Sequence, residues 1–112
     1  MYYLIVYIPI SHLEAVKQAL FEAGAGKFNH YDCACWQTKG TGQYRPLEGS
    51  SPYQGEQGKL ETCEEYKLEL IIEDQYLKAV MDALKKTHPY EEPAFAVIKI
   101  EESFTSAPST IH

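Results

Sequence analysis

Positive charge is scarce in this chain of 112 residues, where 10 Lys and Arg face 16 Asp and Glu and leave a net charge of −6. Proteins that bind phosphate groups need basic patches, so this negative net charge argues against nucleic acid and anionic membranes as partners. Long hydrophobic runs are lacking too. The longest, Leu4 to Ile10, has the length of a strand, well below the roughly 20 residues that span a bilayer. We expect a soluble protein with no membrane partner.

Cysteine is also sparse. Cys33, Cys35 and Cys63 are an odd number without the spacing of a disulfide framework, which is typical of a reducing compartment. The first residues lack the basic region and small-residue cleavage site of a signal peptide. Together these absences predict a cytoplasmic location.

The length and composition fit one globular domain. Hydrophobic residues make up 45% and charged residues 23%, close to ordinary usage. We expect a single domain over residues 1–102, followed by a flexible C-terminal tail over residues 103–112, which is polar and holds Pro108.

The first half of the chain predicts a strand, a helix and a second strand. Residues 2–8 are apolar on both alternating faces, as in a central strand. A helix is expected over residues 11–23, because Ser11 and Glu14 form a capping-box pattern and Gly24 can end it. The second strand is predicted over residues 31–38.

The second half repeats the order. Residues 65–73 alternate strictly between apolar and polar, a second helix can be capped by Asp74 and ends before Pro89, and a last strand covers residues 95–101. The whole order predicts a ferredoxin-like βαββαβ sandwich of the α+β class. In this fold two helices cover one face of a four-stranded antiparallel sheet.

Residues 39–58 interrupt this pattern with five of the seven glycines, Pro46 and Pro52. We expect a long loop with at most a short strand near residues 43–47. A loop of about 20 residues in a compact domain is usually functional or interfacial.

The face of the sheet opposite the helices is predicted to be apolar, with Tyr3, Tyr7, Trp36 and Ile71 on it. A bare apolar face of this size favours self-association, so we expect a homo-oligomer, either a dimer or a trimer.

The segment from His88 to Pro93, His-Pro-Tyr-Glu-Glu-Pro, is the most unusual in the sequence. Two prolines stiffen a backbone that carries an imidazole and two carboxylates. His88 with Glu91 or Glu92 could hold a divalent ion such as zinc or copper, completed by His30 or by a thiolate of Cys33 or Cys35. The alternative is that His88 satisfies the end of the helix and that both carboxylates are solvated.

The cysteines allow two further interpretations. Cys33 and Cys35, predicted on one strand face, could bind a soft metal or serve as small buried side chains. Cys33 could act as a nucleophile with His30 or His88 as base, although no local signature supports this chemistry.

Several of these motifs occur together in one known module. They are listed in chain order: Gly24-Ala-Gly26, Asn29-His30-Tyr31, Cys33, Gly40-Thr-Gly42, Pro46, Gly49, Pro52, Gly55, Gly58-Lys59-Leu60-Glu61 and His88-Pro-Tyr-Glu-Glu-Pro93. With this set the chain, from about Tyr2 to Ile100, resembles the small domain inserted into bacterial proteins of the NGG-interacting-factor-three-like family, and its stand-alone versions.

The resemblance implies a PII-like or CutA-like variant of the ferredoxin-like fold that tends to form oligomers. In longer family members a separate domain carries a dinuclear metal centre, for which 112 residues leave no room. The catalytic residues proposed for the family therefore have no counterparts in this chain, and from the resemblance we do not expect an enzyme. A separately encoded metal-domain protein is one partner that fits this picture.

The leading hypothesis for function is a non-enzymatic, oligomeric binding or regulatory module. Arg45 and Lys59 could offer charge to an anionic ligand, while Tyr44, Tyr53 and Tyr90 could stack on it or donate hydroxyls. The alternative is a divalent-metal protein or metal-dependent accessory that uses the His88 segment.

Overall fold

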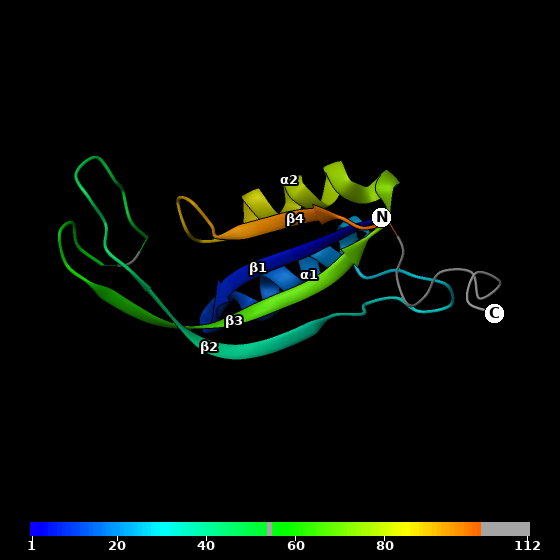
Figure 1. Cartoon of the computed structure of the whole chain (residues 1–112), viewed down its shortest axis with the longest axis horizontal. Coiled ribbons are helices and arrows are strands. Elements are labelled where there is room, and N and C mark those ends of the chain that lie inside the picture. The colour runs from blue at the N-terminus through cyan, green and yellow to red at the C-terminus, as the bar shows by residue number, and fades with distance from the viewer. Residues whose placement is uncertain (54, 102–112) are drawn as a thin grey trace.

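A computed structural model describes residues 1–53 and 55–101, and the fold is drawn in Figure 1. Strand β1 (Tyr2–Pro9) leads through the 3-10 turn η1 (Ile10–His12) into helix α1 (Leu13–Ala23). Strands β2 (Trp36–Tyr44) and β3 (Glu61–Ile72) follow. The turn η2 (Asp74–Tyr76), helix α2 (Leu77–Thr87) and strand β4 (Phe95–Lys99) complete the order.

The four strands form one sheet in the order β2-β3-β1-β4, and each neighbouring pair is antiparallel. Both helices lie on the same face of this sheet (Figure 1). The predicted ferredoxin-like βαββαβ sandwich is therefore confirmed.

The core lies between the sheet and the helices. It is built from alternate residues of the two central strands and from one stripe of each helix: Leu4, Val6, Ile8, Leu68, Leu70, Ile72, Leu13, Val16, Leu20, Val80 and Leu84. The alternation in β3 was predicted, and its inward residues are buried because a period of two points every second side chain at the helices.

The predicted helix ends are right at both C-termini and wrong at both N-termini. Helix α2 ends at Thr87, before Pro89, as predicted. Gly24 ends α1 with φ of 116°, a left-handed conformation that glycine adopts without steric cost. Ser11 and Asp74, however, cap neither helix, because each lies in a 3-10 turn that precedes the helix. The hydroxyl of Ser11 contacts the imidazole of His12, and Asp74 pairs with the N-terminal ammonium.

The second strand is displaced from its predicted position. Residues 31–35 are not in a strand, and Cys33 has φ of 54°, so Cys33 and Cys35 do not share a strand face. Backbone hydrogen bonds from Ala34 to Gly26 and from Gly26 to Ile71 fold this segment into a tight loop. The strand instead runs to Tyr44, through glycines that the sequence marked as loop.

Gly42 has a packing role in that strand. A Cβ at this position would clash with the carboxylate of Glu65 on β3, so a larger residue here requires the Glu65 side chain to shift. Strand β3 likewise begins at Glu61, four residues earlier than predicted. The predicted loop over residues 39–58 is thus a long β2–β3 hairpin with a connection over residues 45–60.

This hairpin extends beyond β1, which pairs with β3 only from Tyr2↔Ile72 to Pro9↔Glu65 (Figure 1). We call residues 39–64 the arm, and the rest of the sheet with its two helices the body. The extents of the molecule, 55 × 24 × 22 Å, reflect this projection.

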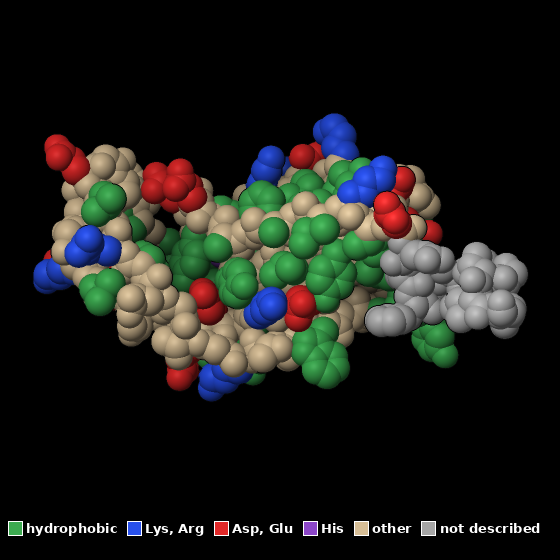
Figure 2. Space-filling model, in the orientation of Figure 1, with side chains coloured by type: hydrophobic (Ala, Val, Ile, Leu, Met, Phe, Trp, Pro, Cys, Tyr) green, Lys and Arg blue, Asp and Glu red, His purple; other side chains and the backbone are tan. Residues whose placement is uncertain are grey.

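The open face of the sheet carries the apolar residues that the sequence placed there. Tyr3 pairs with Ile71, Tyr7 with Lys67 and Trp36 with Glu69, so all four predicted side chains share one face. Trp36 is 68% exposed and Ile98 on β4 48% exposed. Figure 2 views this face and shows hydrophobic side chains over β1 and β4, with a few charges between them.

The predicted tail over residues 103–112, and residue 102 at the domain boundary, lie outside the described residues. Within the described ranges, neither helix is long and apolar enough to cross a membrane.

Candidate functional site

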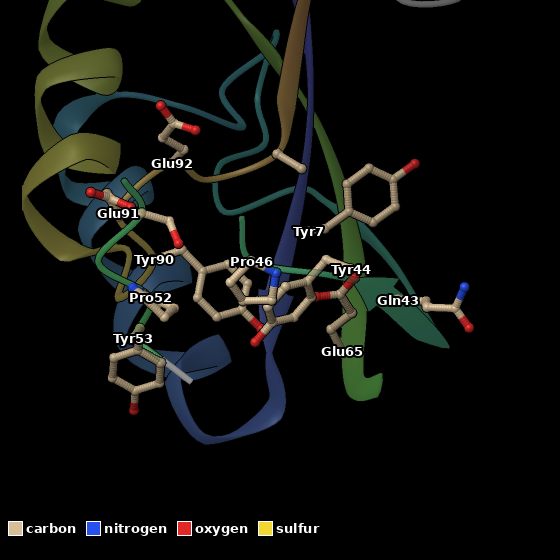
Figure 3. A pocket seen from close by; sticks show the side chains of 12 residues that line it. Tyr7, Gln43, Tyr44, Pro46, Pro52, Tyr53, Glu65, Tyr90, Glu91 and Glu92 are labelled. Atoms are coloured by element: carbon tan, nitrogen blue, oxygen red, sulfur yellow. The ribbon is translucent and has the colours of Figure 1, made fainter. Parts of the chain in front are cut away.

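A cavity of about 300 Å³ lies where the arm meets the body (Figure 3). Its walls come from the end of β1, from Glu65 of β3, from the arm and from the loop between α2 and β4, which we call the 88–94 loop. The lining residues are Tyr7, Gln43, Tyr44, Pro46, Ser50, Pro52, Tyr53, Glu65, Tyr90, Glu91, Glu92 and Ala94.

Aromatic rings form the centre of this cavity. The ring centroid of Tyr90 lies 6.2 Å from that of Tyr44 and 6.0 Å from that of Tyr53. Figure 3 shows Tyr90 beside Tyr44, with Tyr53 and Pro52 on the same side of the cavity. The arm and the 88–94 loop therefore each supply part of one aromatic wall.

A small number of contacts hold the arm against the body. The backbone N–H of Ser51 donates to a carboxylate oxygen of Glu91 at 3.0 Å, and the ring of Tyr53 packs edge-on to His12, with centroids 5.6 Å apart. These two contacts are exposed, whereas Cys63, at the base of the arm, is buried and contacts Tyr90. The outer part of the arm is thus docked without burying a second core.

His88 fixes the 88–94 loop on the body. Its side chain is 6% exposed; Nε2 lies 2.7 Å from the carbonyl oxygen of Tyr7, and Nδ1 accepts from the N–H of Tyr90 at 3.2 Å. A carbonyl only accepts and an N–H only donates, so the neutral Nε2–H tautomer satisfies both contacts. Burial lowers the pKa of His88, which the bond to Tyr7 only partly offsets.

Tyr90 is anchored by a second polar contact. Its hydroxyl lies 3.1 Å from the thiol of buried Cys63 on β3. Burial and this hydrogen bond raise the pKa of Tyr90 well above its usual range, and burial also raises the pKa of Tyr44. Both phenols stay neutral at physiological pH.

The charges on the cavity wall are all negative. Glu65, Glu91 and Glu92 are the charged lining residues, and among the described residues none of them forms an ion pair with Lys, Arg or His. Glu65 is half-buried, and burial raises the pKa of its carboxyl. The cavity is therefore aromatic and acidic.

A family model for the CutA1 divalent ion tolerance protein matches residues 47–107, more than half of the chain. The chain belongs to this CutA1 family. The match includes the connection of the arm, β3, α2 and the 88–94 loop, and thus much of the cavity wall.

The chain is also similar to longer proteins. It is 43% identical over 95 residues to the GTP cyclohydrolase 1 type 2 homolog of Halalkalibacterium halodurans, covering 85% of this chain and 26% of that protein. A crystal structure of a Bacillus cereus protein related to NIF3 superposes with a TM-score of 0.77 at 35% identity, over 90% of this chain and 26% of that one. The chain thus spans about a quarter of these relatives. The predicted relationship to the small domain of NGG-interacting-factor-three-like proteins is confirmed.

The CutA1 fold is also seen in a solved structure of similar size. The crystal structure of CutA1 from Pyrococcus horikoshii matches with a TM-score of 0.67 at 17% identity, over 95% of this chain and 89% of that chain. At this identity the likeness concerns the fold, and the predicted PII-like or CutA-like variant is confirmed.

The predicted ligand-binding residues divide into two groups. Tyr44, Tyr53 and Tyr90 line the cavity, as their prediction as stacking residues requires. Arg45 and Lys59 are not among the lining residues, and Lys59 pairs with Glu56 at 2.9 Å on the arm. The structure brings the aromatic candidates together without the cationic ones.

The predicted metal ligands lie at opposite ends of β1. His30 and Cys33 belong to the loop beside the Tyr2 end, where Gly26 bonds to Ile71, whereas His88 contacts Tyr7 (Figure 1). Within the described part of the chain, no group of three or more His, Cys, Asp or Glu side chains is arranged to hold a metal ion. Zinc or copper binding stays a prediction, and both nitrogens of His88 are already engaged.

Sequence reasoning missed Tyr7 and Glu65 as cavity residues. The sequence predicts Tyr7 on the open sheet face and indicates no role for Glu65. The register decides their role, because Tyr7 pairs with Lys67 and so lies next to Glu65 on the same face, under the arm. No local motif carries this information.

Proposed function

We propose that this chain is a non-enzymatic, oligomeric binding and regulatory module whose small-molecule ligand occupies the cavity between the arm and the 88–94 loop. The observation that carries the proposal is the aromatic wall shared by Tyr44 and Tyr53 of the arm and Tyr90 of the loop. The cavity volume, about 300 Å³, lies at the lower end of the range for small-molecule sites.

The position of the cavity supports a regulatory role. A ligand that contacts both walls binds the docked arm better than an undocked one, so it shifts the arm toward the docked position. The few exposed contacts of the arm, such as Ser51 to Glu91, leave this equilibrium open to a ligand.

Self-association is the second part of the proposal. Trp36 and Ile98 are exposed on the open sheet face together with Tyr3 and Tyr7, an apolar surface that monomers rarely leave bare. The three free thiols, Cys33, Cys35 and Cys63, fit a reducing compartment, which supports a cytoplasmic location.

The enzyme name of the longer relatives is not carried over in this proposal. Those proteins are named GTP cyclohydrolase 1 type 2 homolog, and the part shared with this chain is about a quarter of their length. The described residues of the cavity offer neutral phenols and carboxylates without a paired nucleophile and base.

The test of the binding proposal is a thermal-shift screen of soluble metabolites, with Tyr53→Ala as the cavity variant. Tyr31→Ala is the matched control, since Tyr31 is 69% exposed and lies outside the cavity. We expect at least one stabilising compound whose effect is lost in Tyr53→Ala and kept in Tyr31→Ala. A screen without such a compound contradicts the proposal.

The test of self-association is sedimentation of wild type, Ile98→Glu and Ala15→Glu. Ile98→Glu places a charge on the open face, whereas Ala15→Glu adds the same charge to the exposed surface of α1. We expect an oligomer that dissociates only in Ile98→Glu. A wild-type monomer, or equal behaviour of both variants, contradicts this part of the proposal.

A further inference from the structure

Charge and aromatic character select the kind of ligand that fits the cavity. The charged residues that line it are three carboxylates, and its largest surfaces are the rings of Tyr7, Tyr44, Tyr53 and Tyr90. An anionic ligand would face these carboxylates with no lining cation to compensate, which costs free energy as like charges approach. The residues of the wall thus disfavour an anion.

Glu65 gives the most specific indication of the charge of the ligand. This carboxylate is half-buried above Gly42, and no described cation pairs with it. Partial removal from water without a counter-ion is unfavourable for a carboxylate, and the raised pKa of Glu65 has the same cause. A ligand that brings a positive charge to Glu65 relieves this cost.

The rings add a second attraction for the same kind of ligand. A cation within about 6 Å of an aromatic centroid is attracted by the negative face of the ring. The rings of Tyr44 and Tyr53 adjoin that of Tyr90, with centroids 6.2 and 6.0 Å away, and all three line the same cavity as Glu65. An ammonium group at Glu65 therefore lies beside this cluster of rings. Glu91, held by the N–H of Ser51, adds an oriented negative charge at the rim.

We propose that the cavity binds an organic cation, an amine with an apolar or aromatic body, with its ammonium group at Glu65 and its body against Tyr44, Tyr53 and Tyr90. This inference rests on the proposed function, because it assigns the ligand class of the same cavity. It replaces the anionic ligand that Arg45 and Lys59 suggested in the sequence, since neither residue lines the wall.

The experiment is isothermal titration calorimetry with three probes of matched shape: phenethylamine, 2-phenylethanol and phenylacetate. We expect the amine to bind about tenfold more tightly than the alcohol, because a hydrogen bond between two charged groups is stronger than one from a neutral hydroxyl. Phenylacetate should bind more weakly than the alcohol. Equal affinities of the amine and the alcohol, or tighter binding of phenylacetate, overturn the inference.

Two variants locate the effect. Glu65→Gln should lower the affinity for phenethylamine about tenfold and leave that for 2-phenylethanol unchanged. The matched control is Glu64→Gln, whose carboxylate is exposed, points to the opposite face and lies 3.9 Å from Lys39. An equal loss in both variants, or no loss in Glu65→Gln, overturns the inference.

The result also separates this inference from the proposed function. If all three probes bind alike and Tyr53→Ala weakens them alike, the cavity binds ligands but the assignment to cations is wrong. If no probe binds and no compound of the metabolite screen does, the proposed function itself is wrong.

Discussion

The body and the arm are built on different physical principles. The body buries Leu4, Leu20 and Leu84 completely between its sheet and its helices. The arm is a two-stranded hairpin, in which Leu47 and Leu60 remain more than 60% exposed, and it is docked by a few polar and aromatic contacts. Most of the folding stability therefore comes from the body, whereas the cavity depends on the arm, which is held by fewer buried contacts.

Shortening a buried leucine of the body should have the largest effect. Leu20→Ala removes a fully buried side chain of α1 and should lower the free energy of unfolding by about 3 kcal/mol. The matched change in the arm, Leu60→Ala, should alter it by less than about 0.5 kcal/mol because Leu60 is exposed. Urea denaturation measures both, and similar losses would mean that the arm shares the core of the body.

Replacing His88 should have the next largest effect, because His88 joins the body to the loop of the cavity. His88→Leu leaves the carbonyl of Tyr7 and the N–H of Tyr90 without these partners and should cost about 2 kcal/mol at pH 8.

The pH dependence of stability should change in the same variant. The pKa of His88 is lowered from 6.5 in the folded protein, so the unfolded chain takes up the proton first and wild-type stability falls as the pH drops below about 6.5. Glu65, with a raised pKa, acts in the opposite sense near its ordinary value of 4.5. Urea midpoints at pH 8 and 5.5 should differ in wild type and in the exposed-site control His30→Gln, and differ less in His88→Leu.

A smaller effect is expected where the arm passes Glu65. Gly42→Ala puts a methyl group against this carboxylate, while at Gly40 the same methyl group meets open space. Gly42→Ala should therefore be about 1 kcal/mol less stable than Gly40→Ala, and the displaced carboxylate should weaken binding of the amine probe. Equal stability of the two variants in urea denaturation would show that Glu65 moves aside freely.

The smallest effect is expected from removal of metal. Both nitrogens of His88 are hydrogen-bonded, and the remaining predicted ligands are divided between the two ends of β1. We expect the melting temperature to stay within about 1 °C after dialysis against a chelator, since loss of a structural metal usually costs far more. A clear drop, with stoichiometric zinc or copper by elemental analysis, would favour the metal hypothesis.

Much of the body could be predicted from the sequence, because its signals are local. The alternation of Tyr66, Leu68 and Leu70, and the stripe from Leu13 to Leu20, define which faces are buried. Prediction failed at Gly40 and Gly42, where glycine was interpreted as loop. Pairing with Glu65 and Cys63 keeps both in a strand, and these partners are more than 20 residues away.

The candidate site was predicted only in part for the same reason. Tyr44, Tyr53 and Tyr90 stood out as aromatic residues near proline and glycine, which is a local signal. Whether Arg45 or Glu65 would join them depends on the register of the β2–β3 hairpin and on where β1 ends. A shift by one residue would turn every side chain to the other face.

By itself, the sequence determined the order of helices and strands, the core faces and the likeness to a known module, because hydrophobic periodicity and motif spacing are written along the chain. Only the tertiary structure decided that the glycine-rich segment is an arm, that the tyrosines of the arm and loop share one wall, and that the charge on this wall is negative. These properties depend on contacts between distant residues, such as Ser51 with Glu91 and Cys63 with Tyr90, which no local pattern specifies.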